Sequence, residues 1–139
     1  MPSIFTRIID GEFPGHFVWK DEQAVAFMTI QPVREGHLMV IPRAEIDHWD
    51  DLPEALAAHL MVVSQRIARA LKDAFPCRRI GMMIAGLEVP HTHLHVLPID
   101  DLGDLSFAKA RSADALRLAD EATRIRAALR AHGHKEADF

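Results

Sequence analysis

Three histidines alternate with other residues in the segment His91-Thr92-His93-Leu94-His95, which an apolar pair follows. Side chains alternate faces along a β-strand, so a strand here would place the three imidazoles on one face, about 6.5–7 Å apart. Burying three imidazoles that have no partners would be costly. Core packing explains one such histidine well and all three poorly, so the spacing indicates a functional site.

Imidazoles in this arrangement could do two kinds of chemistry. Two histidines on a strand and a third ligand elsewhere can bind zinc, and Glu88 or Asp100 could complete such a site. Alternatively, a neutral imidazole attacks an electrophile while its neighbours fix its tautomer and stabilise the developing charge. The spacing alone does not distinguish the metal site from the nucleophile.

Composition removes several other classes of function. The chain has 139 residues, nine histidines, one cysteine and a formal net charge of -4. The single Cys77 excludes an internal disulfide framework and argues against a cysteine-rich zinc site. The acidic balance offers no general attraction for nucleic acid or anionic membranes, so we expect neither as a partner. We find no signal-peptide pattern and no run of ~18 apolar residues, and therefore expect a cytoplasmic protein.

An antiparallel sheet and a long helix must position the histidines. Strands are expected at residues 17–20, 24–28, 37–41, 79–85 and 91–97, the last of them ending at Pro98. Apolar side chains at steps of three and four predict a helix over 53–75, with a buried stripe of Leu56, Leu60, Val63, Ile67 and Leu71. The fold class is therefore α+β, with about five strands and one long helix packed across the sheet.

The two ends of the chain are expected to be helical. Ser3 is expected to cap a short helix that ends at Gly11. Residues 99–111 are read as a loop, and Ser112 is expected to cap a last helix that runs to about Ala131 and buries Leu118, Ala122, Ile125 and Leu129. The tail from His132 onward is expected to be frayed.

We expect one domain over 1–139, with a core at 3–98 and an extension at 99–139. The other five histidines are read as incidental: His16, His48, His59, His132 and His134.

The triad and a second motif together resemble the histidine triad (HIT) family. The second motif is the segment 36–42, Gly-His-Leu-Met-Val-Ile-Pro, which places His37 about fifty residues before the triad. The N-terminal segment 4–14, the pair Ala26-Phe27, the 53–75 helix and the segment 88–90 fall in register with the family, so the likeness covers roughly residues 3–98. The resemblance implies a HIT-like fold.

The resemblance also implies a reaction at the α-phosphorus of nucleoside phosphoramidates or phosphate esters. His93 matches the nucleophile, which forms a covalent nucleotidyl-histidine intermediate. His95 matches a donor to the phosphate oxygens, His91 orients the site, and His37 supports it from the neighbouring strand. Histidine rather than glutamine at position 95 favours the hydrolase branch over the transferase branch. No cofactor is implied as a requirement, and a metal bound at the histidines is the less favoured alternative.

The implied ligand is a purine nucleoside monophosphate or a related small molecule, and the implied assembly is a homodimer. The residues that match the nucleotide pocket are Ile4, Phe5, Ile8, Phe27, Thr29, Leu87 and Val89. Ordinary core packing explains the apolar residues at positions 4, 5, 8 and 27 equally well.

Three positions depart from the family pattern. Thr29 stands where an aspartate often binds the ribose, Leu87 and Ala85 replace polar residues before the triad, and residues 43–45 are Arg-Ala-Glu where Lys-Lys-His is usual. The first two changes remove polar contacts to the substrate. They keep open the alternative of a nucleotide-binding or interaction protein with little catalysis.

Overall fold

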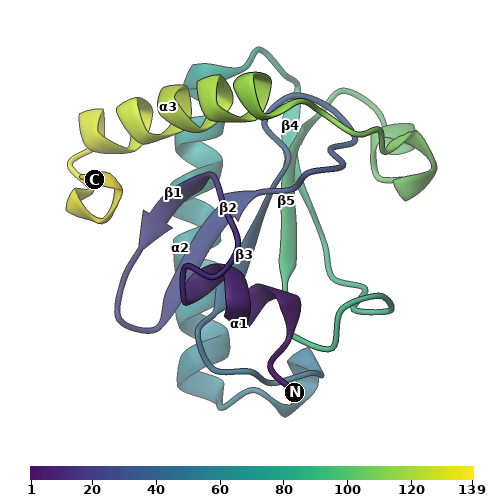
Figure 1. The fold of residues 1–139 in the computed structure, drawn as a ribbon. Coiled ribbons are helices and arrows are strands. Elements are labelled where there is room, and N and C mark those ends of the chain that lie inside the picture. Colours follow the sequence, from purple (N-terminus) through teal and green to yellow (C-terminus); the bar gives the residue numbers. More distant parts are fainter.

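Five strands form one antiparallel sheet in the order β1-β2-β3-β5-β4 in the computed structural model, which describes residues 1–139 (Figure 1). The strands are β1 (Phe17–Lys20), β2 (Ala24–Met28), β3 (Leu38–Pro42), β4 (Arg79–Met83) and β5 (Leu94–Ile99). Every neighbouring pair runs antiparallel. The α+β class and the five-stranded antiparallel sheet are confirmed.

Two helices cover one face of the sheet. Helix α2 (Glu54–Ala74) lies behind the strands in Figure 1, and its predicted apolar stripe is buried throughout. Helix α3 (Ala115–Ala131) packs against α2 and β1, and its predicted stripe is buried as well. These side chains and the inward face of the strands form the main hydrophobic core.

The opposite face carries a smaller apolar cluster under helix α1 (Ile4–Ile9). Ser3 caps α1 as expected, since its hydroxyl accepts a hydrogen bond from the Thr6 N–H. The buried members of this cluster are Phe5, Val25, Phe27, Met39 and Ile41. His95 pairs directly with Met39 across the β3–β5 ladder, so its side chain lies on the same face. This face of the sheet therefore holds the site.

The predicted bounds of the last strand are wrong at both ends. Strand β5 begins at Leu94, so His91 and His93 lie in an irregular segment before it. There the N–H and the hydroxyl of Thr92 both donate to the Ile46 carbonyl, at 2.8 and 2.7 Å. The strand also continues through Pro98. The pairing with β3 ends at Val96, so no ladder bond on that side is lost by the missing N–H.

Smaller corrections apply elsewhere in the sheet and at the C-terminal end. Strand β3 begins one residue later than expected, and β4 ends at Met83 rather than at residue 85. The segment 99–111 contains two short 3-10 helices, Leu102–Asp104 and Phe107–Lys109. Asp114 rather than Ser112 caps α3, because the Ala113 N–H is bonded to the Ile30 carbonyl and lies outside the helix.

The tail is ordered rather than frayed. A 3-10 helix spans Lys135–Ala137, and the Ala137 side chain is fully buried against α3 and β1. None of the helices combines the length and the apolar content that crossing a membrane would require.

Candidate active site

Four histidines that the sequence places in two separate segments meet on the α1 face of the sheet. His37 precedes β3, His91 and His93 lie before β5, and His95 is on β5 itself; all four are buried. The ring centroids of His93 and His95 are 5.0 Å apart, and those of His37 and His95 are 5.1 Å apart. The structure thus brings together all four residues that the sequence predicted.

Hydrogen bonds fix the tautomers of His37 and His95. The Val33 N–H donates to His37 Nδ1 at 3.0 Å, so this nitrogen carries no proton. The proton of neutral His37 is therefore on Nε2, which donates to His95 Nδ1 at 2.9 Å. His95 must then hold its own proton on Nε2. This relay of hydrogen bonds, from the Val33 N–H through His37 to His95, leaves the His95 Nε2–H free to donate to a bound group.

Burial keeps both rings neutral. Desolvation lowers the pKa of His37 to about 4. Desolvation, and then the neighbouring His37 and His93, lower the pKa of His95 to about 3. At neutral pH each ring therefore carries one proton, as the relay requires.

His93 has the opposite tautomer. Its Nδ1 lies 2.7 Å from the His91 carbonyl oxygen, which can only accept, so Nδ1 carries the proton. Its Nε2 therefore keeps a free lone pair. Desolvation is the largest of the causes that lower the pKa of His93, which keeps that lone pair available at neutral pH. Among the four histidines, His93 has the lone pair suited to nucleophilic attack.

His91 is held from both sides. Its Nε2 donates to the Pro42 carbonyl at 2.8 Å, and its Nδ1 accepts from the Ser3 hydroxyl at 2.7 Å. Glu45 fixes this end of α1, since its Oε1 accepts from the Ser3 N–H at 2.6 Å and from the Thr6 hydroxyl at 2.7 Å. The sequence showed Glu45 only as a departure from a motif, and its role depends on a partner about forty residues away.

Helix α3 reaches the site through a buried carboxylate. Glu121 is 3% exposed, and its Oε1 accepts from the Gly36 N–H at 2.9 Å. Gly36 has φ +83°, and a Cβ there would lie 3.0 Å from the Phe75 side chain, so the turn before His37 requires glycine. Sequence analysis missed Glu121, although a charged residue three positions after buried Leu118 was a usable signal.

The apolar residues predicted to contact a nucleotide lie beside the histidines with one partial exception. Phe5 and Phe27 are buried with their rings edge to face, and Phe5 contacts His93 with a centroid distance of 4.8 Å. Ile8 and Val89 are half-buried against the same cluster. Ile4 is 43% exposed on the outer side of α1.

The departures from the family pattern at positions 29 and 87 lie in different surroundings. Leu87 is 94% exposed, so its side chain is free of the protein surface. The Thr29 hydroxyl accepts from the Gln31 N–H at 3.2 Å in the turn after β2. The Thr29 N–H donates to the His37 carbonyl at 3.4 Å, and no hydrogen bond joins Leu87 to any of the four histidines.

Phe107 is a site residue that sequence analysis did not identify. Its ring lies edge to face on His95, with a centroid distance of 4.8 Å. It belongs to the segment that was read as a plain loop. No periodic pattern marks it, because it reaches the sheet through the short 3-10 helix Phe107–Lys109.

The remaining histidines lie outside the cluster. His59 bonds to Asp21 at 2.8 Å and His132 to Asp73 at 2.6 Å. His134 packs beside Trp19, with ring centroids 5.5 Å apart, which again differs from the frayed tail that was expected.

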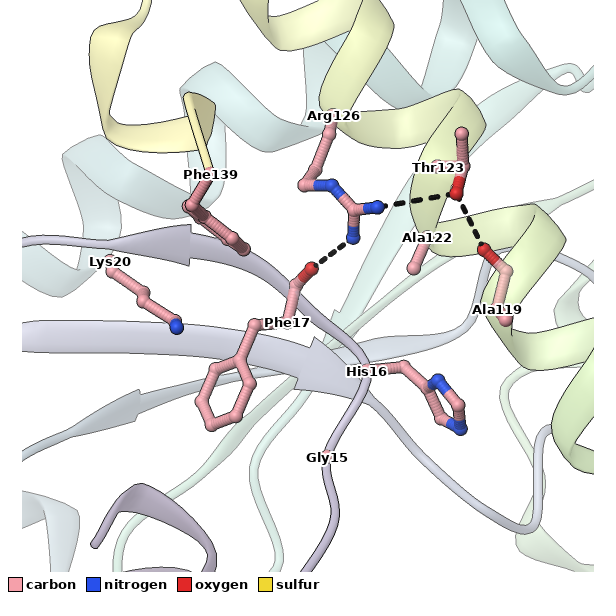
Figure 2. Close-up of a pocket in the computed structure, with 9 residues that line it drawn as sticks. All are labelled: Gly15, His16, Phe17, Lys20, Ala119, Ala122, Thr123, Arg126 and Phe139. Atoms are coloured by element: carbon pink, nitrogen blue, oxygen red, sulfur yellow. Dashed lines mark hydrogen bonds between the residues drawn. The ribbon is translucent and has the colours of Figure 1, made fainter. Parts of the chain in front are cut away.

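A separate hollow of about 350 Å³ lies between the start of β1, helix α3 and the C-terminal residues (Figure 2). Figure 2 shows that its guanidinium, from Arg126, is already engaged, donating to the Phe17 carbonyl at 2.7 Å and to Thr123 at 3.2 Å. The Lys20 ammonium lies over the Phe17 and Phe139 rings. The hollow shares no residue with the histidine cluster, and the chemistry resides in the latter.

No group of three or more His, Cys, Asp or Glu side chains in the structure is arranged to hold a metal ion. Within the cluster, His37 Nε2 and His95 Nδ1 bind each other, and the other engaged nitrogens face carbonyls, a hydroxyl or an amide. The arrangement suits proton placement and nucleophilic attack.

Known proteins are similar to this chain in sequence and in fold. A family model described as HIT domain matches residues 10–102. An uncharacterized HIT-like protein of Mycobacterium tuberculosis is 40% identical over 115 residues, which cover 78% of this chain and 79% of that protein. The adenosine 5'-monophosphoramidase HNT1 of Saccharomyces cerevisiae is 33% identical over 99 residues, which cover 70% of this chain and 63% of the yeast protein. The crystal structure of a zinc-bound histidine triad family protein from Mycobacterium smegmatis superimposes with a TM-score of 0.81, at 29% identity and 94% coverage of both chains.

Proposed function

Because the chain belongs to the histidine triad family, we propose that it is a hydrolase of nucleoside phosphoramidates or phosphate esters, with His93 as its nucleophile. The observation that carries the proposal is the tautomer of His93. Its Nδ1–H is bound to the His91 carbonyl, which leaves Nε2 free to attack. The yeast relative, an adenosine 5'-monophosphoramidase, supports the choice of substrate class.

In the first step, Nε2 of His93 attacks the α-phosphorus and the bond to the leaving group breaks. The product is a nucleotidyl-histidine. His93 gains positive character during the attack, and the His91 carbonyl at its Nδ1–H stabilises that charge. Dividing one difficult displacement into two easier ones is the advantage of a covalent intermediate.

In the second step, water attacks the same phosphorus and releases the mononucleotide and neutral His93. The overall reaction adds one water across the P–N or P–O bond. Negative charge on the phosphoryl oxygens needs donors that are already in position. His95 Nε2–H is such a donor, because His37 holds the other nitrogen of the ring.

The nucleoside is proposed to lie against the apolar surface that α1, β2 and the segment before β5 provide. Phe5, Phe27, Ile8 and Val89 form this surface next to His93. Aromatic and aliphatic side chains suit the flat face of a purine. The proposed ligand is accordingly a purine nucleoside monophosphate group.

The experiment is to mix the protein with an adenosine 5'-phosphoramidate and quench on the millisecond scale. Intact-protein mass spectrometry should show an adenylyl adduct that maps to His93. His93→Ala should lose the adduct and at least about a thousandfold in turnover. His48→Ala is the matched control, because His48 is exposed and outside the cluster. Full turnover by His93→Ala would refute the proposal.

A second candidate is a nucleotide-binding or interaction protein with little catalysis. Leu87 and Thr29 favour it, since Leu87 has no polar group and the neutral Thr29 hydroxyl, which already accepts from the Gln31 N–H, cannot replace the two acceptor oxygens of a carboxylate. Calorimetry with AMP and GMP separates the two candidates. Binding without turnover of the phosphoramidate would support this second candidate, and rapid multiple turnover would exclude it.

We also propose that the chain forms a homodimer through β4 and α2. Strand β4 is at the edge of the sheet with one side unpaired, and Met61 and Val62 expose apolar side chains on α2. Light scattering should give twice the chain mass. Val62→Lys should shift the mass toward the monomer, whereas Leu116→Lys, on the exposed face of α3, should not. A monomer mass for the unaltered protein would contradict the dimer.

A further inference from the structure

A second hollow, of about 510 Å³, lies where the chain turns from α2 into β4 (Figure 1). Four cationic side chains line this hollow: Arg69, Lys72, Arg78 and Arg79. No aspartate or glutamate lines it, although the whole chain has a formal net charge of -4. The hollow therefore gathers positive charge on an acidic protein.

The two acidic residues that adjoin the hollow have other partners. Asp73, in the last turn of α2, binds His132 at 2.6 Å. Asp100 accepts from the Arg78 N–H at 3.0 Å with one carboxylate oxygen and from Arg34 at 3.0 Å with the other. None of the ion pairs of the chain includes a cation of the hollow. Its positive charge is therefore uncompensated within the chain.

Structural roles explain two of the four cations. Lys72 is in the last turn of α2, where a positive charge is favourable for the helix dipole. The Arg78 guanidinium donates to the Asp100 carbonyl at 3.2 Å. Arg69 and Arg79 are exposed, and their side chains donate no hydrogen bond within the chain. Because like charges repel, gathering them costs free energy, and these two have no structural partner that offsets the cost.

The donor set of the hollow suits phosphate. A guanidinium presents a planar fork of N–H groups that matches phosphate oxygens, and three of the four cations are arginines. Gln65 lines the same hollow and carries an amide that can donate as well. The volume lies within the range of small-molecule sites, about 300–1,000 Å³. One phosphate group would meet only part of this charge, whereas a chain of phosphates meets all of it.

We propose that this hollow binds an oligophosphate chain, with Arg69 and Arg79 supplying the free donors. The site shares no residue with the histidine cluster, so it does not depend on the proposed hydrolase. The proposed homodimer is compatible with it. Antiparallel pairing of two β4 strands would place the two Arg79 residues at opposite ends of the shared ladder, so each chain keeps its own hollow.

The test is calorimetry of the unaltered protein with inorganic tripolyphosphate, in low and in physiological salt. Tripolyphosphate should bind once per chain, and the affinity should fall as salt screens the charges. Inorganic phosphate should bind at least about tenfold more weakly, because it reaches fewer of the four cations. Absence of tripolyphosphate binding in low salt would refute the site.

Variants test which cations hold the anion. Arg69→Ala and Arg79→Ala should each weaken tripolyphosphate binding about tenfold, because each removes charge-assisted hydrogen bonds. Arg69→Lys keeps the charge and should lose less affinity than Arg69→Ala. Lys135→Ala is the matched control, since it removes one exposed cation that does not line the hollow, and it should keep the affinity within about twofold. Equal losses in Lys135→Ala and Arg69→Ala would show attraction to net charge alone and would overturn the proposal.

Backbone NMR spectra locate the bound anion. Tripolyphosphate should shift the amide signals of residues 65–80. Shifts confined to the four site histidines and their neighbours would assign the anion to the active site and overturn the proposal. A titration with ATP then identifies the source of the phosphate chain. If ATP shifts the 65–80 signals and Arg79→Ala abolishes these shifts, the hollow accepts a nucleotide triphosphate; if only tripolyphosphate moves them, the ligand is a free oligophosphate.

Activity separates this site from the proposed hydrolase. Turnover of adenosine 5'-phosphoramidate should be unchanged in Arg69→Ala and Arg79→Ala, because neither residue lies in the active site. Both side chains are exposed, so the thermal unfolding of these variants should also be unchanged. A protein that binds tripolyphosphate through Arg69 and Arg79 and turns over no phosphoramidate would keep this site and refute the hydrolase.

Discussion

The Glu121 carboxylate on α3 accepts a hydrogen bond from the Gly36 N–H at 2.9 Å, directly before His37 in the chain. Its other oxygen accepts from Arg117 at 2.7 Å. The turn that aims His37 at His95 is therefore held from the far end of the chain. This contact connects the C-terminal helix to the proton arrangement in the site.

Glu121→Ala should destabilise the protein and slow the reaction. The Gly36 N–H would be left buried without an acceptor, which costs about 1–3 kcal/mol. A displaced His37 would release His95, and a small misplacement of this kind costs about 10- to 100-fold in kcat. Urea unfolding and steady-state kinetics measure the two effects.

Glu121→Gln keeps an acceptor and should restore most of the stability and of kcat. Asp120→Ala, on the exposed side of the same helix, should change the free energy of unfolding by less than about 0.5 kcal/mol. Equal effects of Asp120→Ala and Glu121→Ala would show that the contact with Gly36 has no special role.

Ser3→Ala removes two interactions at once. It deletes the cap of α1 and the hydroxyl that donates to His91 Nδ1. Loss of a cap costs about 1 kcal/mol. Loss of the donor to His91 should also lower kcat, because the His91 carbonyl positions His93.

Asp114→Ala is the matched control for this change. It removes the cap of α3, where Asp114 accepts from the Arg117 N–H, and it leaves His91 untouched. Both variants should lose similar stability, and only Ser3→Ala should lose kcat. If kcat is the same in both, His91 does not depend on Ser3.

Stability should fall as the pH is lowered from about 6.5. The pKa of His37 is about 4 and that of His95 is about 3 in the folded protein, against 6.5 for an ordinary histidine. The unfolded chain therefore binds more protons than the folded chain in this range. The stability that neutral His37 and His95 contribute is complete above pH 6.5 and is lost as the pH falls toward their folded pKa values. The free energy of unfolding should fall by about 2 kcal/mol for each histidine between pH 7 and pH 5.

His37→Gln provides the comparison. It removes one titrating ring, so the loss of stability between pH 7 and pH 5 should be smaller, whatever the stability of the variant at pH 7. Glu45, whose pKa is lowered by its hydrogen bonds to Ser3 and Thr6, reduces the free energy of unfolding only at pH values below its ordinary pKa of 4.5. If the free energy of unfolding falls by the same amount between pH 7 and pH 5 in the variant and in the unaltered protein, His37 is not a buried neutral ring.

In the pH profile of kcat/KM, the acid limb, where kcat/KM falls as the pH is lowered, should lie below pH 6.5. Burial is the main cause of the lowered pKa of His93, and attack requires the neutral ring. The charge of Glu88 acts in the opposite direction and raises that pKa. Glu88→Gln should therefore move the limb to lower pH, whereas Glu22→Gln, in the turn between β1 and β2, should not. A limb that stays in place in Glu88→Gln would exclude this charge effect.

Removal of metal should leave turnover unchanged. The hydrogen bonds of the cluster already engage His37 Nε2 and His95 Nδ1 with each other. Kinetics before and after dialysis against EDTA, with metal analysis of untagged protein, measure this. Stoichiometric zinc together with loss of turnover would restore the metal-site hypothesis.

The sequence predicted the elements whose evidence is local. The stripe from Leu56 to Leu71 identified α2, and short apolar runs bounded by turn residues identified the strands. The sequence also predicted the four site histidines, through spacing and a second motif. Local patterns were sufficient because the helix repeats its apolar side chains at steps of three and four, and because turn residues bound each apolar run of the sheet.

The errors lie where distant backbone groups decide the conformation. The start of β5 depends on the bonds of Thr92 to Ile46, and the cap of α3 depends on the bond of Ala113 to Ile30. The tail is ordered by the burial of Ala137 against α3 and β1. Glu45, Glu121, Phe107 and the contact of Ser3 with His91 were missed for the same reason, since each acts on a residue that is distant along the chain.

The match to the family model ends at residue 102, whereas Phe107 and Glu121 lie beyond it. A graft or chimera cut at that boundary would keep all four histidines. It would lose the residue that holds the His37 turn and the ring that lies on His95. The segment that a chimera must carry to keep the chemistry of the site is therefore longer than the segment 10–102 that matches the family model, and it must extend at least through α3.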